Sequence, residues 1–461
     1  MLTKAIIREL GEIVGPQHVL TSPEDLVAYS YDGTFVEHRP DAVVSPVTTD
    51  EVSRVMQVAF REEIPLVPRG MASGLAAASV PASGGLVLCL TRMNKVLNID
   101  MLNMPAQVEA GVVTADLQAQ VESMGLFYPP GPSSIKHSAL GGNVACNAGG
   151  PRCLKYGVTG DYVMGLVTVL ADGQVLQSGG KAVKNGTAYN LTDLLVGSEG
   201  TLGVITEVLL KLIPRPKFVR TAMAVYPALD DATKTVNSIL LAGVLPATIE
   251  LMDDTTIGTI EEYLHLGLPT DAAAILLIEA DGGDEATVAQ EIETVGRMCR
   301  ESGASEVRVA HTESERNDLW RGRRSVSPSL ARRRPNKLGE DISVPRASIP
   351  EAIRRIKSVG RKHGLPIAVF GHAGDGNLHP NILFDKRDAE EWKRAELASR
   401  DIFGIAVELG GTLSGEHGVG LLKLPYLPLA VGSLEVELMQ GIKRVFDPKG
   451  IMNPGKKLPN S

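Results

Sequence analysis

A proline-rich break near the middle of the chain, residues 213–216 (Ile-Pro-Arg-Pro), limits the fold more than any other feature. Prolines on both sides of one residue can neither extend a helix nor lie in a central strand. Strand-like runs, helical stretches and glycine-rich turns alternate before the break, and a more regular order begins after it. Because 461 residues are too many for one ordinary core, we expect a first domain over 1–214, a second over 217–415 and a C-terminal segment over 416–461.

After the break, apolar runs with strand character alternate with amphipathic helical stretches. The expected elements are a strand to Tyr226, a helix to Leu241, a strand over 247–252, a helix, a strand over 273–279, a helix over 285–300 and a strand over 306–310. Two strand-helix-strand units of this kind predict a ferredoxin-like α+β layer. We expect a hairpin and a long helix over 388–409 to follow it.

The composition excludes several classes of protein. A net charge of −8 and a pI near 5.7 argue against nucleic-acid binding, which needs a basic face. No apolar run approaches the length of a membrane span, and the charged N-terminal stretch is unlike a signal peptide. We therefore expect a cytoplasmic protein without a transmembrane segment, which reaches a membrane only through partner subunits.

Four cysteines occur, Cys89, Cys146, Cys153 and Cys299, and none of them belongs to a Cys-x-x-Cys pair. The sequence therefore encodes neither an iron–sulfur cluster nor a zinc ribbon. Any iron–sulfur centre that works with this protein must belong to another chain.

Two histidine clusters lie near the C-terminus. The first, over 371–379, follows a short apolar run and contains an Asp375-Gly376 turn signal, so it predicts a β-hairpin. Such a hairpin would bring His372 and His379 face to face. The second cluster, over 415–418, adds Glu416 and His417.

Two imidazoles and the carboxylate of Glu416 would form a three-ligand site with open positions, which suits Zn, Mn or Fe. His417 would then remain available for proton transfer. The same set of groups could equally activate water in a zinc hydrolase. The alternative without function is that each histidine is an isolated polar residue on a glycine-rich loop.

Three glycine-rich stretches lie in the first half of the chain, over 68–75, 130–156 and 196–206. Small residues in succession let backbone N–H groups surround an anion such as a pyrophosphate, although tight turns have a similar composition. Neither the G-x-G-x-x-G fingerprint nor the phosphate loop G-x-x-x-x-G-K-[ST] is present. On spacing alone, these stretches indicate only an anion-binding site.

Longer motifs make the assignment more specific. The segment over 128–163, YPPGPSSIKHSALGGNVACNAGGPRCLKYGVTGDYV, resembles the FAD-binding core of the vanillyl-alcohol oxidase and p-cresol methylhydroxylase superfamily. The motifs VGSEGTLGVITE, FGHAGDGNLHP, GEHGVG and the closing NPGK are similar to those of the glycolate oxidase group, which includes D-lactate and D-2-hydroxyglutarate dehydrogenases. The resemblance implies an α+β fold: a PCMH-type FAD-binding domain of two α/β subdomains, a ferredoxin-like substrate (cap) domain, and a C-terminal segment that returns to FAD.

The resemblance also implies which residues lie near the flavin. They are Pro68, Arg69, Gly70, Ala72, Ser73, Gly74, Leu75, Pro130, Gly131, Ser134, Leu140, Gly141, Gly142, Asn143, Asn147, Gly149, Gly150, Tyr156, Gly157, Glu199, Gly200, Gly203, Ile205, Asn453 and Lys456. The chain departs from the usual pattern at Met71 and over 76–78, where three alanines stand. No histidine occurs over 69–74, where some relatives attach the flavin covalently, so we expect non-covalent FAD.

In the second domain, the resemblance assigns His372, His379 and Glu416 to a divalent metal and His417 to substrate deprotonation. It places Arg323 on the substrate carboxylate, where a guanidinium fork fits. Asn381 is a candidate for a hydrogen bond to the substrate hydroxyl, and the alternative is a hairpin residue that points at solvent.

The expected activity is FAD-dependent oxidation of a small D-2-hydroxy acid, glycolate or D-lactate, to the 2-oxo acid. Electrons would pass to a partner subunit that carries iron–sulfur or flavin, or to an electron-transferring flavoprotein. The alternatives are a D-2-hydroxyglutarate-type dehydrogenase, a zinc hydrolase and a non-catalytic FAD-binding subunit.

Overall fold

The computed structural model describes residues 2–459, which divide into two compact units. Unit 1 contains the chain up to Gly150, Gly157–Arg215 and the segment from Glu416 onward, and unit 2 contains Pro151–Tyr156 and Pro216–Gly415. Both units combine helices with sheets, so the predicted α+β class is confirmed. Among the described helices, none combines the length and the apolar content that a membrane crossing requires.

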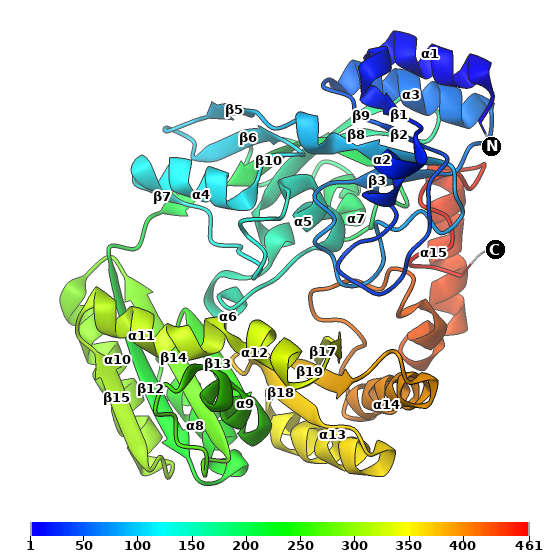
Figure 1. The fold of residues 1–461 in the computed structure, drawn as a ribbon. Helices are drawn as coiled ribbons and strands as arrows, with labels where there is room; N and C mark the ends of the chain where they lie inside the picture. Colours follow the sequence, from blue (N-terminus) through cyan, green and yellow to red (C-terminus); the bar gives the residue numbers. More distant parts are fainter. Residues whose placement is uncertain (1, 460–461) are drawn as a thin grey trace. The chain divides into compact units, whose positions relative to one another are not determined.

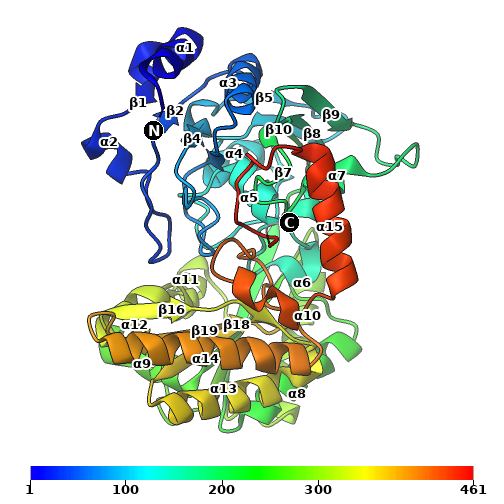
Figure 2. The same cartoon turned by 90° about the vertical axis from the view of Figure 1, so that its right-hand side faces the viewer.

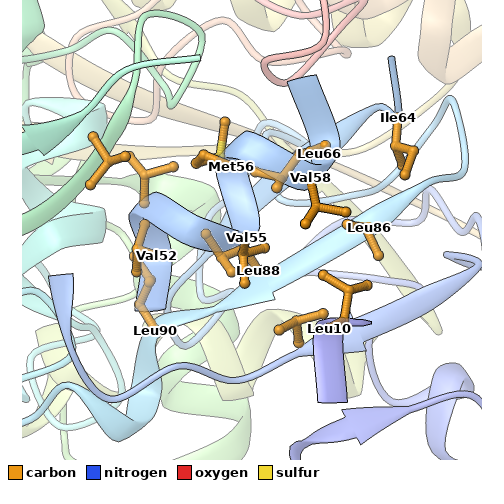
Figure 3. Close-up of a cluster of buried hydrophobic side chains, with 14 of the residues drawn as sticks. Leu10, Val52, Val55, Met56, Val58, Ile64, Leu66, Leu86, Leu88 and Leu90 are labelled. Atoms are coloured by element: carbon orange, nitrogen blue, oxygen red, sulfur yellow. The ribbon is translucent and has the colours of Figure 1, made fainter. Parts of the chain in front are cut away.

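The first sheet of unit 1 has the strand order β1-β2-β4-β3, with β2, β4 and β3 parallel. Its strands are β1 (Val19–Leu20), β2 (Ala42–Val44), β3 (Leu66–Arg69) and β4 (Leu86–Cys89). Helix α3 (Thr49–Arg61) places Val52, Val55 and Met56 on one face, and these side chains are buried against the sheet and α1 (Lys4–Val14) (Figure 3). Thr48 caps α3 by accepting a hydrogen bond from the Glu51 N–H at 3.1 Å.

The second sheet of unit 1 is entirely antiparallel, in the order β5-β6-β10-β8-β9. Its strands are β5 (Val96–Ile99), β6 (Pro105–Glu109), β8 (Val163–Val169), β9 (Val175–Gly179) and β10 (Val204–Lys211). Outside the two sheets, β7 (Leu126–Phe127) pairs with β11 (Ile213–Pro214). The remaining helices of this unit are α2 (Pro23–Val27), α4 (Thr114–Ser123), α5 (Leu140–Cys146), α7 (Leu191–Leu195) and α15 (Ser433–Phe446).

The C-terminal segment completes the core of unit 1. Leu66 of β3 forms a parallel bridge with Met452, the Leu66 N–H donates to the Ile451 carbonyl at 2.8 Å, and the Asn453 N–H donates to the Leu66 carbonyl at 2.8 Å. Ile451 and Met452 are buried in the same cluster as α3. Residues from the two ends of the chain therefore share one core.

Unit 2 is built on one large sheet, in the order β15-β12-β14-β13-β18-β19-β16, with β17 (Ile342–Ser343) also paired to β19 (Figure 1). Its strands are β12 (Phe218–Tyr226), β13 (Thr248–Asp253), β14 (Ala274–Gly282), β15 (Glu306–Ala310), β16 (Asn336–Gly339), β18 (Ile367–His372) and β19 (Asn377–Phe384). The order β15-β12-β14-β13 is the ferredoxin-like order, so this prediction is confirmed. The hairpin β18–β19 continues the same sheet, because β18 pairs with β13.

The helices of unit 2 connect and cover these strands. They are α6 (Cys153–Tyr156), α8 (Leu229–Leu241), α9 (Asp254–Leu264), α10 (Glu285–Glu301), α11 (Glu313–Arg324), α12 (Val326–Arg333), α13 (Ile349–His363) and α14 (Ala389–Glu408). Helices α13 and α14 pack side by side, as Figure 2 shows in yellow and orange. Apolar side chains of α9 and α12 pack against the sheet around Met252, Ile275 and Leu383.

Candidate metal centre and cofactor loops

The hairpin β18–β19 brings the two predicted histidine ligands together. His372 pairs with Asn377 and His379 with Phe370, so the imidazoles are diagonal neighbours on one face rather than directly opposite. Their Nε2 atoms lie 3.4 Å apart. The turn needs its glycine, because Gly376 has a φ of 87° and a Cβ there would lie 2.0 Å from a backbone carbonyl oxygen.

Glu416 completes the predicted ligand set. One ligand atom from each of His372, His379 and Glu416 lies within 4.8 Å of the other two. Both histidines are buried and Glu416 is half-buried. Two imidazoles and one carboxylate form the donor set that Zn²⁺ and related transition-metal ions prefer, so these residues fit a divalent metal.

Glu250 of β13 fixes the orientation of His372. The two residues are cross-strand partners, and Glu250 Oε1 lies 2.5 Å from His372 Nδ1. The Glu250 side chain is fully buried. Because Nδ1 is engaged, Nε2 is the nitrogen of His372 that faces His379 and could bind a metal. Glu250 could not be identified from the sequence, because it lies 122 residues before His372 in a strand of buried residues.

Arg323 of α11 contacts the other oxygen of the same carboxylate. Its Nε and Nη2 atoms each lie 2.6 Å from Glu250 Oε2, and its guanidinium carbon lies 4.8 Å from the centroid of the Phe370 ring. Burial raises the pKa of Glu250, but the charges of Arg323 and His372 outweigh burial and hold that pKa at about 2. Arg323 thus stabilises an ionised carboxylate behind His372, and its contact with the substrate remains a prediction.

Asp341, which is also fully buried, ties the second histidine cluster to the hairpin. Its Oδ2 atom accepts hydrogen bonds from Ser414 Oγ at 2.7 Å and from the Gly415 N–H at 3.0 Å, and Oδ1 accepts one from Asn377 Nδ2 at 2.6 Å. A Cβ at Gly415 would lie 2.2 Å from Asn377 Nδ2, so only glycine permits this approach. The residue that precedes Glu416 is therefore held against β19. Asp341 was not predicted from the sequence.

The two other residues predicted to act on the substrate lie beside the ligands. Asn381 follows His379 by two residues on β19, which puts both side chains on one face, and Asn381 Nδ2 donates to the His379 carbonyl at 2.9 Å. His417 is half-buried, and its Nε2 atom lies 3.8 Å from Glu416 Oε1. The catalytic roles of Asn381 and His417 remain predictions.

In unit 1, residues with a left-handed backbone gather in the loops that were assigned to FAD. Ala72, Asn147, Glu199 and Asn453 have φ values of 53°, 52°, 54° and 42°. For a residue such as alanine or glutamate this conformation costs about 1–3 kcal/mol, and it persists where the surroundings enforce it, often at ligand sites. The sequence signal for these loops was their glycine content, which does not identify the strained residues.

The glycines of these loops have two different roles. A Cβ on Gly74 or Gly142 would meet no atom within 4 Å, so both face open space that a ligand can use. Gly141, in contrast, packs so that a Cβ would lie 2.6 Å from Ala110 Cβ. A Cβ on Gly200 would lie 3.1 Å from the ring of Pro68, which shows that the loop around residue 200 reaches the start of the first glycine-rich stretch.

Two predicted cofactor residues have structural partners. The guanidinium of Arg69 donates weakly to the Ala28 carbonyl at 3.3 Å. Tyr156 belongs to unit 2, where its hydroxyl donates to Asp281 at 2.8 Å and Lys155 Nζ lies 2.6 Å from the same carboxylate. Tyr156 is therefore part of unit 2, and its contact with the cofactor remains a prediction.

Glu199 links the third glycine-rich stretch to the C-terminal segment. Its carboxylate accepts hydrogen bonds from the Val419 N–H at 2.8 Å and the Gly420 N–H at 2.7 Å, and it lies 3.2 Å from Lys457 Nζ. The sequence predicted that Glu199 lies against the cofactor. In the structure its carboxylate oxygens bind the C-terminal segment.

Asn453 and Lys456 bring the C-terminal segment back to the same loops. Asn453 Nδ2 donates to the Glu199 carbonyl at 2.7 Å and to the Ala78 carbonyl at 3.0 Å, while its Oδ1 accepts from Lys456 Nζ at 2.6 Å. Lys456 is 3% exposed, and burial lowers its pKa to about 8. A buried ammonium group needs an anionic partner, so these residues fit the pyrophosphate of a dinucleotide such as FAD.

Comparison with known proteins finds a family match in each half of the chain. Residues 40–179 match the family described as "FAD binding domain", and residues 215–457 match "FAD linked oxidases, C-terminal domain". The chain is 45% identical to "Glycolate oxidase subunit GlcD" of Bacillus subtilis (strain 168), and the match covers 99% of this chain and 97% of the relative. It is 35% identical to "D-lactate dehydrogenase" of Anaerostipes hadrus over 99% of this chain and 97% of the relative.

Two solved structures share the fold. p-Cresol methylhydroxylase with substrate bound has a TM-score of 0.83 at 18% identity, and the match covers 99% of this chain and 97% of that chain. Alkyldihydroxyacetonephosphate synthase has a TM-score of 0.76 at 21% identity, covering 98% and 86%. The predicted superfamily fold is confirmed. With a matched FAD-binding domain, a matched C-terminal domain and relatives that align along the whole chain, this protein belongs to the family of FAD-linked oxidases.

Proposed function

We propose that this protein is an FAD-dependent dehydrogenase that oxidises a small D-2-hydroxy acid, glycolate or D-lactate, to the 2-oxo acid. The names of its relatives support this substrate class, since they include D-lactate dehydrogenase, a glycolate oxidase subunit and, at 33% identity, D-2-hydroxyglutarate dehydrogenase. A larger D-2-hydroxy acid of the last type is the alternative substrate.

The observation that carries the proposal is the convergence of His372, His379 and Glu416 in an FAD-linked oxidase. Together these residues would hold a divalent cation, Zn, Mn or Fe. When bound, such a cation supplies a Lewis acid for the hydroxyl and carboxylate oxygens of the substrate. An α-hydroxy acid presents both oxygens on adjacent carbons, which suits a metal site with open positions.

The protein's own residues would perform the remaining tasks. His417 accepts the hydroxyl proton on a ring nitrogen, as a general base. Asn381 donates a hydrogen bond to the substrate hydroxyl or its product, and Arg323 contributes positive charge for the substrate carboxylate. Glu250 keeps Nε2 of His372 directed at the metal position.

FAD supplies the acceptor for the hydride that leaves the Cα atom. The loops of unit 1 would hold it without a covalent bond, through backbone N–H groups near Ala72 and Gly142 and through Lys456. The electrons then pass to a separate redox protein, a partner subunit with iron–sulfur or flavin or an electron-transferring flavoprotein. This step is proposed because no Cys-x-x-Cys pair occurs in the sequence and because relatives are named as subunits. A cytoplasmic location, with membrane contact only through partners, is part of the same proposal.

An anaerobic titration tests the proposal. The purified yellow protein is mixed with glycolate, D-lactate or D-2-hydroxyglutarate, and L-lactate serves as the matched control. We expect bleaching of the flavin band by a D-2-hydroxy acid or glycolate, and loss of bleaching after chelation while FAD stays bound. A colourless protein, or a yellow protein that no hydroxy acid bleaches, would contradict the proposal.

A further inference from the structure

Helix α15 of unit 1 exposes a continuous apolar stripe. Leu434, Leu438, Ile442 and Val445 are 66%, 61%, 36% and 80% exposed. Their spacings of four, four and three residues put them on one face of the helix. We call these four residues the α15 stripe. Figure 2 shows the helix in red at the outside of unit 1.

The opposite face of α15 holds the helix in place. Lys443 Nζ donates to the Thr201 carbonyl at 2.6 Å and to the Met452 carbonyl at 2.9 Å, and it pairs with Asp447 at 2.5 Å. Met439 and Phe446 are half-buried on that side. The helix that carries the stripe is therefore held in place. The apolar side chains of the stripe are not buried within the unit, so the core of unit 1 does not account for them.

Gly441 lies in the middle of the stripe. Glycine is a poor helix former, so a glycine in an exposed helix interior lowers the stability of the helix. Such a glycine is expected where a close neighbour leaves no room for a side chain. The nearest heavy atom to a Cβ at this position would be Arg444 Nη2, 3.9 Å away, so the fold around α15 does not require glycine. A second helix that crosses closely at this point would require it.

The charges along the stripe indicate what kind of helix would pack against α15. Glu437 and Arg444 flank the same side, seven residues apart, and within residues 2–459 neither of them forms an ion pair. In an antiparallel pair of identical helices with Leu438 opposite Gly441, each Glu437 lies within reach of the other copy's Arg444. A parallel pair would put equal charges at equal heights, and it would also align the helix dipoles unfavourably.

We propose that the α15 stripe is a homodimer interface, in which α15 packs antiparallel against α15 of a second copy. Leu434 and Val445 then form the outer layers of the contact, Leu438 and Gly441 form the inner layers, and two Glu437–Arg444 pairs fix the register. The contact is self-complementary, as a two-fold interface requires.

Sedimentation equilibrium of the FAD-loaded protein over a series of micromolar concentrations tests the pairing. We expect a mass that approaches twice the 49.0 kDa of the chain. Leu438→Glu should raise the dimer dissociation constant by about tenfold or more, since it places a charge in the apolar centre. Leu241→Glu is the matched control, because Leu241 of α8 is 88% exposed and lies outside the stripe. FAD content verifies that each variant is folded.

A charge swap tests the register. Glu437→Arg and Arg444→Glu should each weaken the dimer about threefold, as expected for exposed charges, whereas the double variant should return to within about twofold of the unmodified protein. A monomeric unmodified protein would overturn the proposal, and would indicate that a different protein covers the stripe. A dimer that survives Leu438→Glu, or a double variant that is as weak as the single ones, would overturn it as well.

Discussion

Unit 2 positions its candidate ligand His372 and the chain before Glu416 with buried charged side chains, whereas unit 1 shapes its candidate cofactor loops with backbone conformation. Around His372 and Gly415, the carboxylates of Glu250 and Asp341 are fully buried and accept directed hydrogen bonds. Around Ala72 and Glu199, left-handed residues set the path of the chain. A metal needs side-chain atoms held within tenths of an ångström, while a pyrophosphate is recognised by a row of N–H groups. A substitution in the cofactor loops should therefore leave metal binding intact, and a substitution behind His372 should leave FAD binding intact.

Loss of the proposed base should have the largest effect. His417→Ala should lower the rate of flavin reduction by substrate by about 10²–10⁴-fold, because proton removal from the hydroxyl loses its catalyst. FAD content and metal content should remain those of the unmodified protein. Stopped-flow absorbance under anaerobic conditions measures the rate. His363→Ala on α13, a histidine bonded to Asp401, is the control. An unchanged rate of flavin reduction would show that His417 is not the general base.

Loss of the carboxylate behind His372 should have the next largest effect. Glu250→Gln keeps the volume of the side chain but removes the charge that orients His372, so metal affinity should fall by about 10–100-fold. Titration of the metal-free protein with Zn²⁺ or Co²⁺ measures the affinity, and FAD binding should not change. Glu279→Gln is the matched control, since Glu279 is a buried carboxylate on the same sheet that accepts from Trp320. Equal metal affinity in both variants would contradict the role of Glu250.

Loss of the side chain that joins the cofactor loops should affect only unit 1. Asn453→Ala removes two hydrogen bonds to carbonyl groups and one from Lys456, each worth about 0.5–1.5 kcal/mol. We expect weaker FAD binding, by about tenfold, and unchanged metal affinity. Flavin fluorescence measures FAD binding. Asn185→Ala, at an exposed position of the same unit, should have no effect. A fall in metal affinity would show that the two units are not independent.

The smallest expected effect is a dependence of FAD binding on pH. Burial lowers the pKa of Lys456 to about 8, so this side chain is charged below that pH and neutral above it. Because a pyrophosphate needs the charged form, the dissociation constant of FAD should rise as the pH increases through about 8. Lys456→Arg should remove the dependence, since a guanidinium stays charged. A dissociation constant of FAD that does not change with pH in the unmodified protein would contradict a contact between Lys456 and the cofactor.

Local patterns in the sequence were enough to predict much of unit 2. The alternation of strands and amphipathic helices over 219–310 predicted the ferredoxin-like order, and the Asp375-Gly376 pair predicted the hairpin. Both are short-range signals. That the hairpin extends the same sheet depends on the pairing of β18 with β13, which no local pattern encodes.

The residues that support the site could not be predicted either, because their contacts join positions that are far apart in the sequence. Glu250 lies in a strand of buried residues, and nothing in the sequence of that strand indicates a partner 122 positions away. Arg323 was noticed through family resemblance, yet its two contacts with Glu250 could not be expected without the fold. Glu199 was assigned to the cofactor loops through the same resemblance, and the hydrogen bonds from amides near residue 420 to its carboxylate could not be expected without the fold. Long-range charge pairing is invisible in a single sequence.

Ile451 and Met452 are buried in the same core as α3, so this core is completed by residues that are synthesised late. A ribosome makes the first residues of unit 1 long before the last ones, and each of the two late side chains contributes about 1.5–3 kcal/mol once buried. Until residues 451–456 are synthesised, the nascent N-terminal region lacks this contribution and lacks Lys456. Flavin binding through Lys456, as proposed above, therefore has to wait until residues 451–456 have been synthesised.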